Sequence, residues 1–486
     1  MTKEKSRMTP GCKPFWLAAL LCLALSSQAQ DILPENVAAA LRTAQINPAS
    51  LSALVLPLSG GAARLAHFDA RPMAPASTLK LATTLVALEE LGPTFRWQTR
   101  LLGKGEQRAE VWRGTLFLRG GGDPNLTWDG MRSLLRSLRA QGIRRLDADL
   151  VLDRSFFQPS RPDLGAPVFD ESPNAYYNVI PDALLLNGNM VEFSISSDAQ
   201  HSTVRTQPPL SLFRIDADLS LNDSACEAWD DDWDAPQTTL TRAGRISVKL
   251  RGAFPRNCST RTRLSVLDRN LYIERFVRAA WSELGGSWRG RVRDGATPPE
   301  AQLLAERKSE TLADLVRPVN KVSDNAMART LYLTLGTQLP VTARSDNTLV
   351  NAQAAMLAWF ARNGIASEGL VFENGSGLSR LERITARQMA GLLQLGARSN
   401  WYAEFASSLP IVAVDGAMRK RLHDSPAAAR ARIKTGTLRD AVAIAGYVRD
   451  ANNQDWVVAA MINDVDAKKG RPALDALVHW VAGGVN

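Results

Sequence analysis

The feature that most constrains this chain is a set of three short motifs in a fixed order. Ser77-Thr78-Leu79-Lys80 comes first, and Ser77 is the only serine with a lysine three positions later. Ser323-Asp324-Asn325 and Lys434-Thr435-Gly436 follow, and the last is the only K-[ST]-G sequence in the chain. Each motif alone is a weak signal. Three motifs in this order, on suitable local structure, are a strong one.

Local patterns place the first motif at the start of a helix predicted for residues 76–91, which Gly92-Pro93 ends. Ser77 and Lys80 are three residues apart, so their side chains share one face of this helix. A serine hydroxyl needs a base to become a good nucleophile, and Lys80 is that base only when its amine is neutral. Burial, the positive helix N-terminus and a second cation, supplied by Lys434, favour the neutral amine. The alternative is a helix-start serine beside a solvated lysine.

The second motif lies between predicted helical stretches. Ser323 could relay a proton between Lys80 and a leaving amine, and Asn325 could hold a substrate amide. The alternative role of such residues is to cap a helix N-terminus. That role suits the repeated tripeptide Ser345-Asp346-Asn347 better, because a helix is expected to begin near residue 347.

The third motif falls in a strand predicted for residues 431–438. A strand that borders a cleft can pair with an extended peptide through its backbone. Lys434 and the hydroxyls of Thr435 and Thr437 would bind a terminal carboxylate, and the Thr437 N–H would help to hold an oxyanion. Gly436 is expected to leave room for the ligand, since a side chain there would crowd it. The alternative is a turn glycine beside a surface lysine.

The N-terminus has the pattern of an export signal over residues 1–29. A basic head precedes the apolar residues 15–25, a run much shorter than the about 20 residues of a membrane-spanning helix. Ser27-Gln28-Ala29 places small residues before a cleavage point after Ala29. We therefore expect the protein in the periplasm, with no transmembrane anchor after cleavage.

Cys226 and Cys258 are the only cysteines after this signal. In an oxidising compartment they are expected to form a disulfide, with two buried thiols as the alternative. The net charge of +9 fits an anionic envelope, and a solvated basic surface explains it equally well. No basic run with interleaved aromatic residues suggests nucleic acid. The four scattered histidines predict no metal site, no cofactor is expected, and no pattern indicates an oligomeric state.

The hydrophobic patterns predict an α+β fold. Two N-terminal strands and three C-terminal strands would form one antiparallel sheet covered by helices. They are expected at residues 51–58, 63–68, 431–438, 441–448 and 456–462. The middle of the chain, residues 96–267, carries short alternating runs rich in Gly, Pro and Asp, which predicts a mostly-β insertion into this domain.

The three motifs, with Asn187-Gly188-Asn189 and the segment from Asn374 to Arg380, resemble the class C low-molecular-mass penicillin-binding proteins, the D-alanyl-D-alanine carboxypeptidase/endopeptidase family. About 246 residues separate Ser77 from Ser323, against roughly sixty in compact serine β-lactamases of the same fold. The excess lies where this family carries its large insertion. Arg329 departs from the pattern, because the family often has an acidic residue there.

The resemblance implies a serine β-lactamase/penicillin-binding-protein-like domain. Its organisation would be a signal peptide at 1–29, the two parts of the catalytic domain at 30–95 and 268–486, and the inserted, mostly-β residues 96–267 between them.

The implied activity is that of a serine DD-peptidase. Ser77 would attack the carbonyl between two D-alanine residues of a peptidoglycan stem peptide, release the terminal one and leave an acyl-enzyme for water to hydrolyse. A DD-endopeptidase would cut cross-links similarly, and β-lactam antibiotics would acylate the same serine. One alternative is a β-lactamase-like hydrolase, although no E-x-x-L-N segment of the class A enzymes lies between Ser323 and Lys434. The other is a cell-wall-binding protein with a vestigial site, which the intact motifs argue against.

Overall fold

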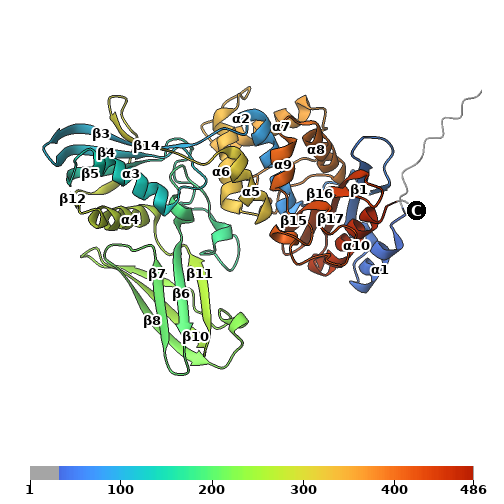
Figure 1. The fold of residues 1–486 in the computed structure, drawn as a ribbon, viewed down its shortest axis with the longest axis horizontal. Helices are drawn as coiled ribbons and strands as arrows, with labels where there is room; N and C mark the ends of the chain where they lie inside the picture. The colour runs from blue at the N-terminus through green and yellow to red at the C-terminus, as the bar shows by residue number, and fades with distance from the viewer. Residues whose placement is uncertain (1–31, 485–486) are drawn as a thin grey trace, which may run out of the picture.

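The computed structural model describes residues 32–484, and the predicted signal peptide lies outside this range. Within it, no helix combines the length and the apolar character that crossing a membrane requires. One lobe of the molecule contains both ends of the described chain, and the middle of the chain forms the rest (Figure 1).

A five-stranded sheet joins the two ends of the chain, in the order β15-β16-β17-β1-β2. All neighbouring strands are antiparallel, and Leu51 pairs with Ile462 where β1 meets β17. The prediction of one antiparallel sheet drawn from both ends of the chain is confirmed. The strands are β1 (Leu51–Pro57), β2 (Leu65–His67), β15 (Ala431–Thr437), β16 (Ala441–Arg449) and β17 (Asp455–Asn463).

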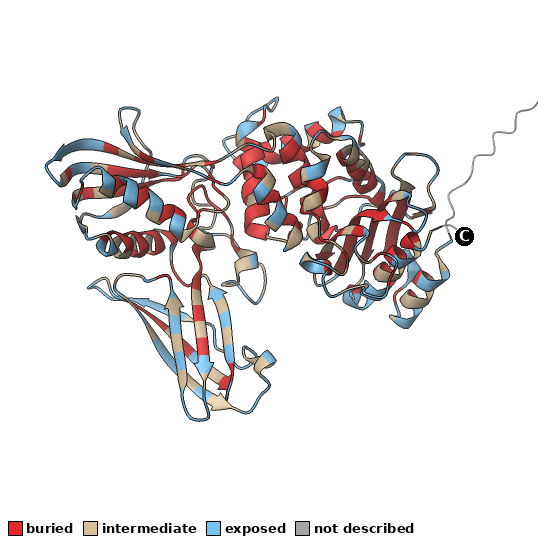
Figure 2. Ribbon diagram, viewed as in Figure 1, coloured by how far each residue is buried: buried red, intermediate tan, exposed pale blue. Residues whose placement is uncertain are grey.

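Helices cover both faces of this sheet. Val442 and Ile444 face a core shared with α1 (Glu35–Thr43) and α10 (Arg471–Ala482). Ala443 and Ala445 face a larger core on the opposite side, because successive side chains of a strand point in opposite directions. Figure 2 shows the buried residues concentrated in the sheet and its covering helices. The second face is covered by α2 (Lys80–Leu91), α5 (Leu312–Lys321), α6 (Asn325–Gln338), α7 (Thr348–Arg362), α8 (Ala386–Arg398) and α9 (Tyr402–Ser408).

The second motif separates α5 from α6, as its sequence predicted. Ser323 has a φ of +65°, a left-handed conformation that stops the helix, and Asp324 begins the next one. The Asp324 carboxylate accepts a hydrogen bond from the Met327 N–H at 2.9 Å, which is an N-cap contact. This sharp break presents Ser323 and Asn325 at the start of α6.

The insertion contains a mixed sheet in the order β12-β5-β4-β3-β14, with β13 also paired to β5. Helix α3 connects the parallel strands β4 and β5, as a parallel pair requires. Its elements are β3 (Gln98–Arg108), β4 (Val111–Arg119), α3 (Trp128–Ala140), β5 (Arg145–Asp153), α4 (Arg269–Glu283), β12 (Ser287–Arg289), β13 (Val292–Asp294) and β14 (Gln302–Lys308).

Elements that follow residue 267, the expected end of the insertion, share the insertion's core. Tyr272 and Phe276 of α4 lie in the same core as the insertion's sheet, as does Ala305 of β14. Strand β14 also pairs with β3 along its length. Since these elements have no core without the insertion, we propose that the inserted unit extends to about Lys308.

Two further sheets of three strands form a smaller β unit, with orders β8-β10-β9 and β11-β6-β7. Cys226 and Cys258 form a disulfide in this unit, with their Cα atoms 5.4 Å apart, so the predicted pairing is present. Strands β7 and β8 are mostly intermediate or exposed (Figure 2). The strands are β6 (Val191–Ser197), β7 (Ser202–Gln207), β8 (Phe213–Asn222), β9 (Gln237–Leu240), β10 (Ile246–Pro255) and β11 (Ser259–Leu264).

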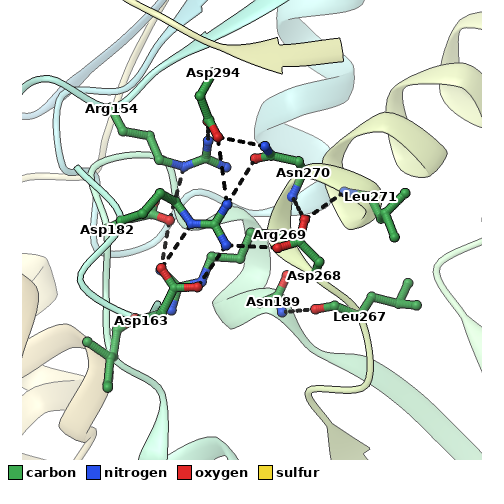
Figure 3. A network of polar contacts seen from close by, with 12 residues as sticks. Arg154, Asp163, Asp182, Asn189, Leu267, Asp268, Arg269, Asn270, Leu271 and Asp294 are labelled. Atoms are coloured by element: carbon green, nitrogen blue, oxygen red, sulfur yellow. Dashed lines mark hydrogen bonds and ion pairs between the residues drawn. The ribbon is translucent and has the colours of Figure 1, made fainter. Parts of the chain in front are cut away.

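Residues 154–182, called the strap here, run between the insertion and α6. A network of ion pairs fixes the strap to the insertion (Figure 3). Arg154 Nε lies 3.0 Å from Asp182 Oδ2, which Arg269 Nη1 of α4 approaches at 2.7 Å. The Arg154 and Asp182 side chains are almost completely buried. Because buried charges are costly unless paired, this network holds the strap in one position.

We expect Asp182→Ala to destabilise the insertion by roughly 3–5 kcal/mol, because two buried guanidinium groups lose their shared carboxylate. Thermal unfolding and limited proteolysis of the strap would measure the loss. Asp223→Ala is the matched control, since Asp223 pairs with Arg256 at an exposed position, and it should change stability by less than about 1 kcal/mol. Equal effects of the two variants would contradict a structural role for the buried network.

Candidate active site

Ser77 lies in the short 3-10 helix η2 (Ala76–Leu79), directly before α2. The backbone around it is tightly constrained. Ala76 has a φ of +45°, an unfavourable conformation for a residue with a side chain. Gly377 packs so closely that a Cβ on it would lie 1.8 Å from the Ala76 carbonyl oxygen. The Ser77 side chain is therefore presented from a rigid turn.

The amine of Lys80 contacts three oxygen atoms from three segments of the chain. Its Nζ lies 2.9 Å from Ser77 Oγ, 2.6 Å from Asn325 Oδ1 and 2.5 Å from the Ser376 carbonyl oxygen. The amide and carbonyl oxygens are acceptors only, so each requires an N–H from the amine. A neutral amine has two N–H groups and one lone pair. After both N–H groups are used, the lone pair remains to accept the Ser77 hydroxyl proton.

The surroundings of Lys80 favour that neutral form. The side chain is fully buried, and burial lowers its pKa well below the ordinary value for lysine. The positive charge of Lys434 lowers the pKa further, while the carboxylates of Asp324 and Glu382 oppose this effect. Two of these influences, burial and a second cation, are the ones expected from the sequence.

Lys434 of β15 lies at the second motif. Its Nζ donates to Ser323 Oγ at 2.9 Å and to the Thr435 carbonyl oxygen at 2.8 Å. The side chain is fully buried, which lowers the pKa of Lys434 to about 7. Near neutral pH its amine therefore changes charge easily, and an anion bound beside it would favour the ammonium form.

The strap completes the surroundings of the second motif. Asn325 Nδ2 donates to the Tyr177 carbonyl oxygen at 3.0 Å, while its Oδ1 accepts from Lys80. The Tyr176 hydroxyl donates to Asp324 Oδ2 at 2.8 Å. These contacts define which end of the Asn325 amide faces the lysine. The insertion thus supplies backbone and side-chain partners to the site.

The remaining residues of the third motif line β15. Gly436 packs on the turn that carries Ser77, and a Cβ on it would lie 2.8 Å from both the Pro75 carbonyl oxygen and the Ser77 nitrogen. The expected reason for this glycine was room for a ligand; the contact that excludes a side chain is with the protein's own backbone. Thr435 is partly buried, and Thr437 is exposed with its hydroxyl 3.3 Å from Arg471 Nη2.

The structure thus brings all three motifs together. The Lys80–Asn325 contact joins the first to the second, Lys434–Ser323 joins the second to the third, and Gly436 packs against Ser77. The repeated tripeptide Ser345-Asp346-Asn347 instead precedes α7. There Asn347 Oδ1 caps the helix by accepting from the Leu349 N–H at 2.9 Å.

Sequence reasoning missed the two backbone carbonyl groups of this site, those of Tyr177 and Ser376. The glycines that flank Ser376 were the available signal for the second group, because Gly375 and Gly377 both adopt a positive φ. No residue type marks the Tyr177 carbonyl, which reaches the site only through the path of the strap.

Comparison with known protein families identifies the chain. The family model described as "D-Ala-D-Ala carboxypeptidase 3 (S13) family" matches residues 33–483. The chain belongs to this family. It is a serine-type D-Ala-D-Ala carboxypeptidase.

Individual relatives of this carboxypeptidase are distant but extend over most of the chain. D-alanyl-D-alanine carboxypeptidase DacB of Haemophilus influenzae is 26% identical over 83% of this chain and 84% of its own length. The D-alanyl-D-alanine carboxypeptidase of Actinomadura sp. is 25% identical over 86% of this chain and 78% of its own length.

Solved structures support the same fold. The crystal structure of penicillin-binding protein 4 from Haemophilus influenzae matches with a TM-score of 0.75 and 22% identity, covering 92% of this chain and 98% of that one. The same protein complexed with a β-lactam matches with a TM-score of 0.71, 22% identity and the same coverage. The predicted penicillin-binding-protein-like α+β fold is confirmed.

The lowered pKa of Lys434 predicts how the carboxypeptidase's stability depends on pH. The unfolded chain keeps this amine protonated up to about pH 10, so between about pH 7 and 10 it binds more protons than the folded protein. Below pH 7 the folded protein bears the full cost of a buried ammonium group, and the cost disappears as the pH rises. The stability of Lys434→Met relative to the wild type should therefore be greater at pH 6 than at pH 10, by up to about 4 kcal/mol.

Chemical denaturation at several pH values would measure this difference. Lys420→Met, at an exposed position, is the control and should follow the wild-type pH profile. Parallel profiles for Lys434→Met and the wild type would show that the folded protein does not depress this pKa.

Proposed function

We propose that Ser77 is the nucleophile of this carboxypeptidase and that neutral Lys80 is its base. The observation that carries the proposal is the position of the Lys80 amine, 2.9 Å from Ser77 Oγ, with two fixed acceptors for its N–H groups. An amine held in this way accepts the hydroxyl proton as the oxygen attacks a carbonyl.

The second and third motifs supply the other roles. Lys434, with the Thr435 and Thr437 hydroxyls, binds the carboxylate of a stem peptide that ends in D-Ala-D-Ala. This anion makes the ammonium form of Lys434 more favourable, which suits an amine with a pKa of about 7. Ser323 Oγ accepts a hydrogen bond from Lys434. Its hydroxyl relays the proton from the Lys80 amine to the leaving nitrogen.

The reaction then follows two steps. Ser77 Oγ bonds to the carbonyl carbon, the amide C–N bond breaks, and the terminal D-alanine leaves with the proton taken from Ser77. Water attacks the acyl-enzyme with its proton transferred to Lys80, and Ser77 recovers its hydroxyl proton as the shortened peptide departs. Asn325 holds the amide of the donor peptide, and the N–H groups of Ser77 and Thr437 stabilise the oxyanion.

The same site extends to two further ligands. A DD-endopeptidase reaction differs only in the amine that leaves, since the acyl group is again D-alanine, so we propose that the enzyme also cuts peptidoglycan cross-links. β-Lactams present a reactive amide beside a carboxylate and are proposed to acylate Ser77, in line with the β-lactam complex of the similar Haemophilus influenzae protein. We propose that the enzyme acts in the periplasm, where peptidoglycan lies and where the predicted export signal would direct it.

Ser77→Ala should abolish covalent labelling by penicillin and release of D-alanine from a pentapeptide, because it removes the attacking oxygen. Intact-protein mass spectrometry and a D-alanine assay would measure both. Ser345→Ala, in the repeated tripeptide, is the matched control and should behave as the wild type. Penicillin found on Ser345 or Ser376 would refute the assignment.

The two lysines should respond differently to arginine, which keeps the charge but does not deprotonate readily. Lys80→Arg should slow acylation by several orders of magnitude for every ligand, because the base is lost. Lys434→Arg should be milder and should mainly affect ligands with a free carboxylate. Acylation rates for a carboxylate ligand and its ester, measured in both variants, would test this. Equal losses irrespective of the carboxylate would contradict the division of roles.

A further inference from the structure

Glu382 is a buried carboxylate that lies outside the three motifs. Its side chain is 0% exposed. One oxygen, Oε1, accepts hydrogen bonds from the backbone N–H groups of Glu373, Asn374 and Gly375, at 3.3, 2.9 and 2.9 Å. A carboxylate is costly to bury unless donors of this kind compensate it. Three successive N–H groups that converge on one oxygen fix the backbone of residues 373–377, called the 373–377 turn here.

The 373–377 turn makes two hydrogen bonds to α2, the helix that carries the base. The Thr83 hydroxyl donates to the Gly375 carbonyl oxygen at 2.6 Å. Lys80 Nζ donates to the next carbonyl oxygen, that of Ser376, at 2.5 Å. Thr83 and Lys80 are one turn apart on the same helix face. The hydrogen bonds from Glu382 and Thr83 therefore hold the residues directly before the carbonyl group that orients the amine.

The same turn also packs against the nucleophile. Gly377 has a φ of +77° and lies against Ala76, where only a residue without a side chain fits. A Cβ on Gly377 would lie 2.8 Å from the Ser77 nitrogen. Displacement of the turn would thus move an acceptor of Lys80 and a support of Ser77 together.

We propose that Glu382 is a positioning residue: by holding the 373–377 turn, it keeps the Ser376 carbonyl where it directs the lone pair of Lys80 toward Ser77. This inference rests on the proposed role of Lys80 as the base. It concerns geometry, since Glu382 makes no hydrogen bond to Lys80 among those of the described residues.

The negative charge of Glu382 favours the protonated form of Lys80, whereas its hydrogen bonds hold the turn that orients the neutral amine. The titratable groups that face Glu382 are Lys80 of α2, Arg329 and Tyr332 of α6, and Glu373 of the 373–377 turn. Its negative charge raises the pKa of Lys80, whereas the positive charge of Arg329 lowers it. Arg329 is the residue that departs from the family pattern, and in this chain its charge and that of Glu382 oppose each other at the base. Charge and geometry can therefore be separated by mutation.

Glu382→Gln keeps an oxygen to accept the three N–H groups but removes the charge. Its acylation by fluorescent penicillin should stay within about fivefold of the wild type, and the ascending limb of the pH profile should move to lower pH. Glu382→Ala removes the acceptor. Its acylation rate constant should fall by at least about 100-fold, both for ligands with a free carboxylate and for ligands without one. Its noncovalent binding of the ligand before acylation should change by less than about threefold.

Hydrogen exchange gives a readout that does not depend on activity. The amides of residues 373–375 should exchange faster in Glu382→Ala and remain protected in Glu382→Gln. Asp450→Ala is the matched control, because Asp450 is equally buried and accepts from the N–H groups of Asn452 and Gln454 at the other end of the sheet. It should lower stability without lowering acylation by the folded protein.

Each of three results would overturn the inference. They are acylation of Glu382→Ala at the wild-type rate, unchanged hydrogen exchange of the amides of residues 373–375 in that variant, and equal impairment of Glu382→Gln and Glu382→Ala. Where Glu382→Ala does not fold, Thr83→Val replaces it: it removes only the hydroxyl that anchors Gly375, and should slow acylation about tenfold with binding unchanged. An unaltered rate in Thr83→Val would then count against the proposal. Failure of the proposed function would be distinct, because the wild type would not be labelled at Ser77.

Discussion

The rest of the site depends on the hydrogen bonds of one fully buried amine, that of Lys80. Its partners, Ser77 Oγ, Asn325 Oδ1 and the Ser376 carbonyl oxygen, come from segments far apart in the sequence. An amine removed from water must replace its hydration with protein acceptors, so all three segments must be held at hydrogen-bond distance at once. The sheet, the break before α6 and the 373–377 turn serve that requirement. The same burial that imposes it also lowers the pKa of the amine.

Charges around the site are arranged so that two amines can be buried close together. Each amine lowers its own cost by losing its proton, and the lowered pKa values of Lys80 and Lys434 express this. The carboxylates of Asp324, which is half-buried, and Glu382, which is fully buried, oppose the shift at Lys80. Each is held by N–H or O–H donors, Asp324 by the Met327 N–H and the Tyr176 hydroxyl. The site is therefore a balance of desolvation and charge.

The insertion contributes to the active site through the strap. Its two ends, Arg154 and Asp182, belong to the ion-pair network that fixes the strap to the insertion, as Figure 3 shows. Between these ends, Tyr176 and Tyr177 contact Asp324 and Asn325. Because the Asn325 amide is held between the Tyr177 carbonyl and Lys80, a shift of the strap would displace an acceptor of the Lys80 amine. The insertion is therefore part of the structure that holds Asp324 and Asn325 beside Lys80.

The sequence by itself determined the order and identity of the three motifs, the strands of the central sheet and the break at Ser323, because each is written in residue type or in the period of apolar residues. It also predicted the Cys226–Cys258 disulfide. Only the tertiary structure decided that Gly436 makes room for the backbone at Ser77, that the insertion's core continues to Ala305, and that the Tyr177 and Ser376 carbonyls complete the site. Every residue has a carbonyl group, so no side-chain pattern marks the one that packing brings to a buried amine.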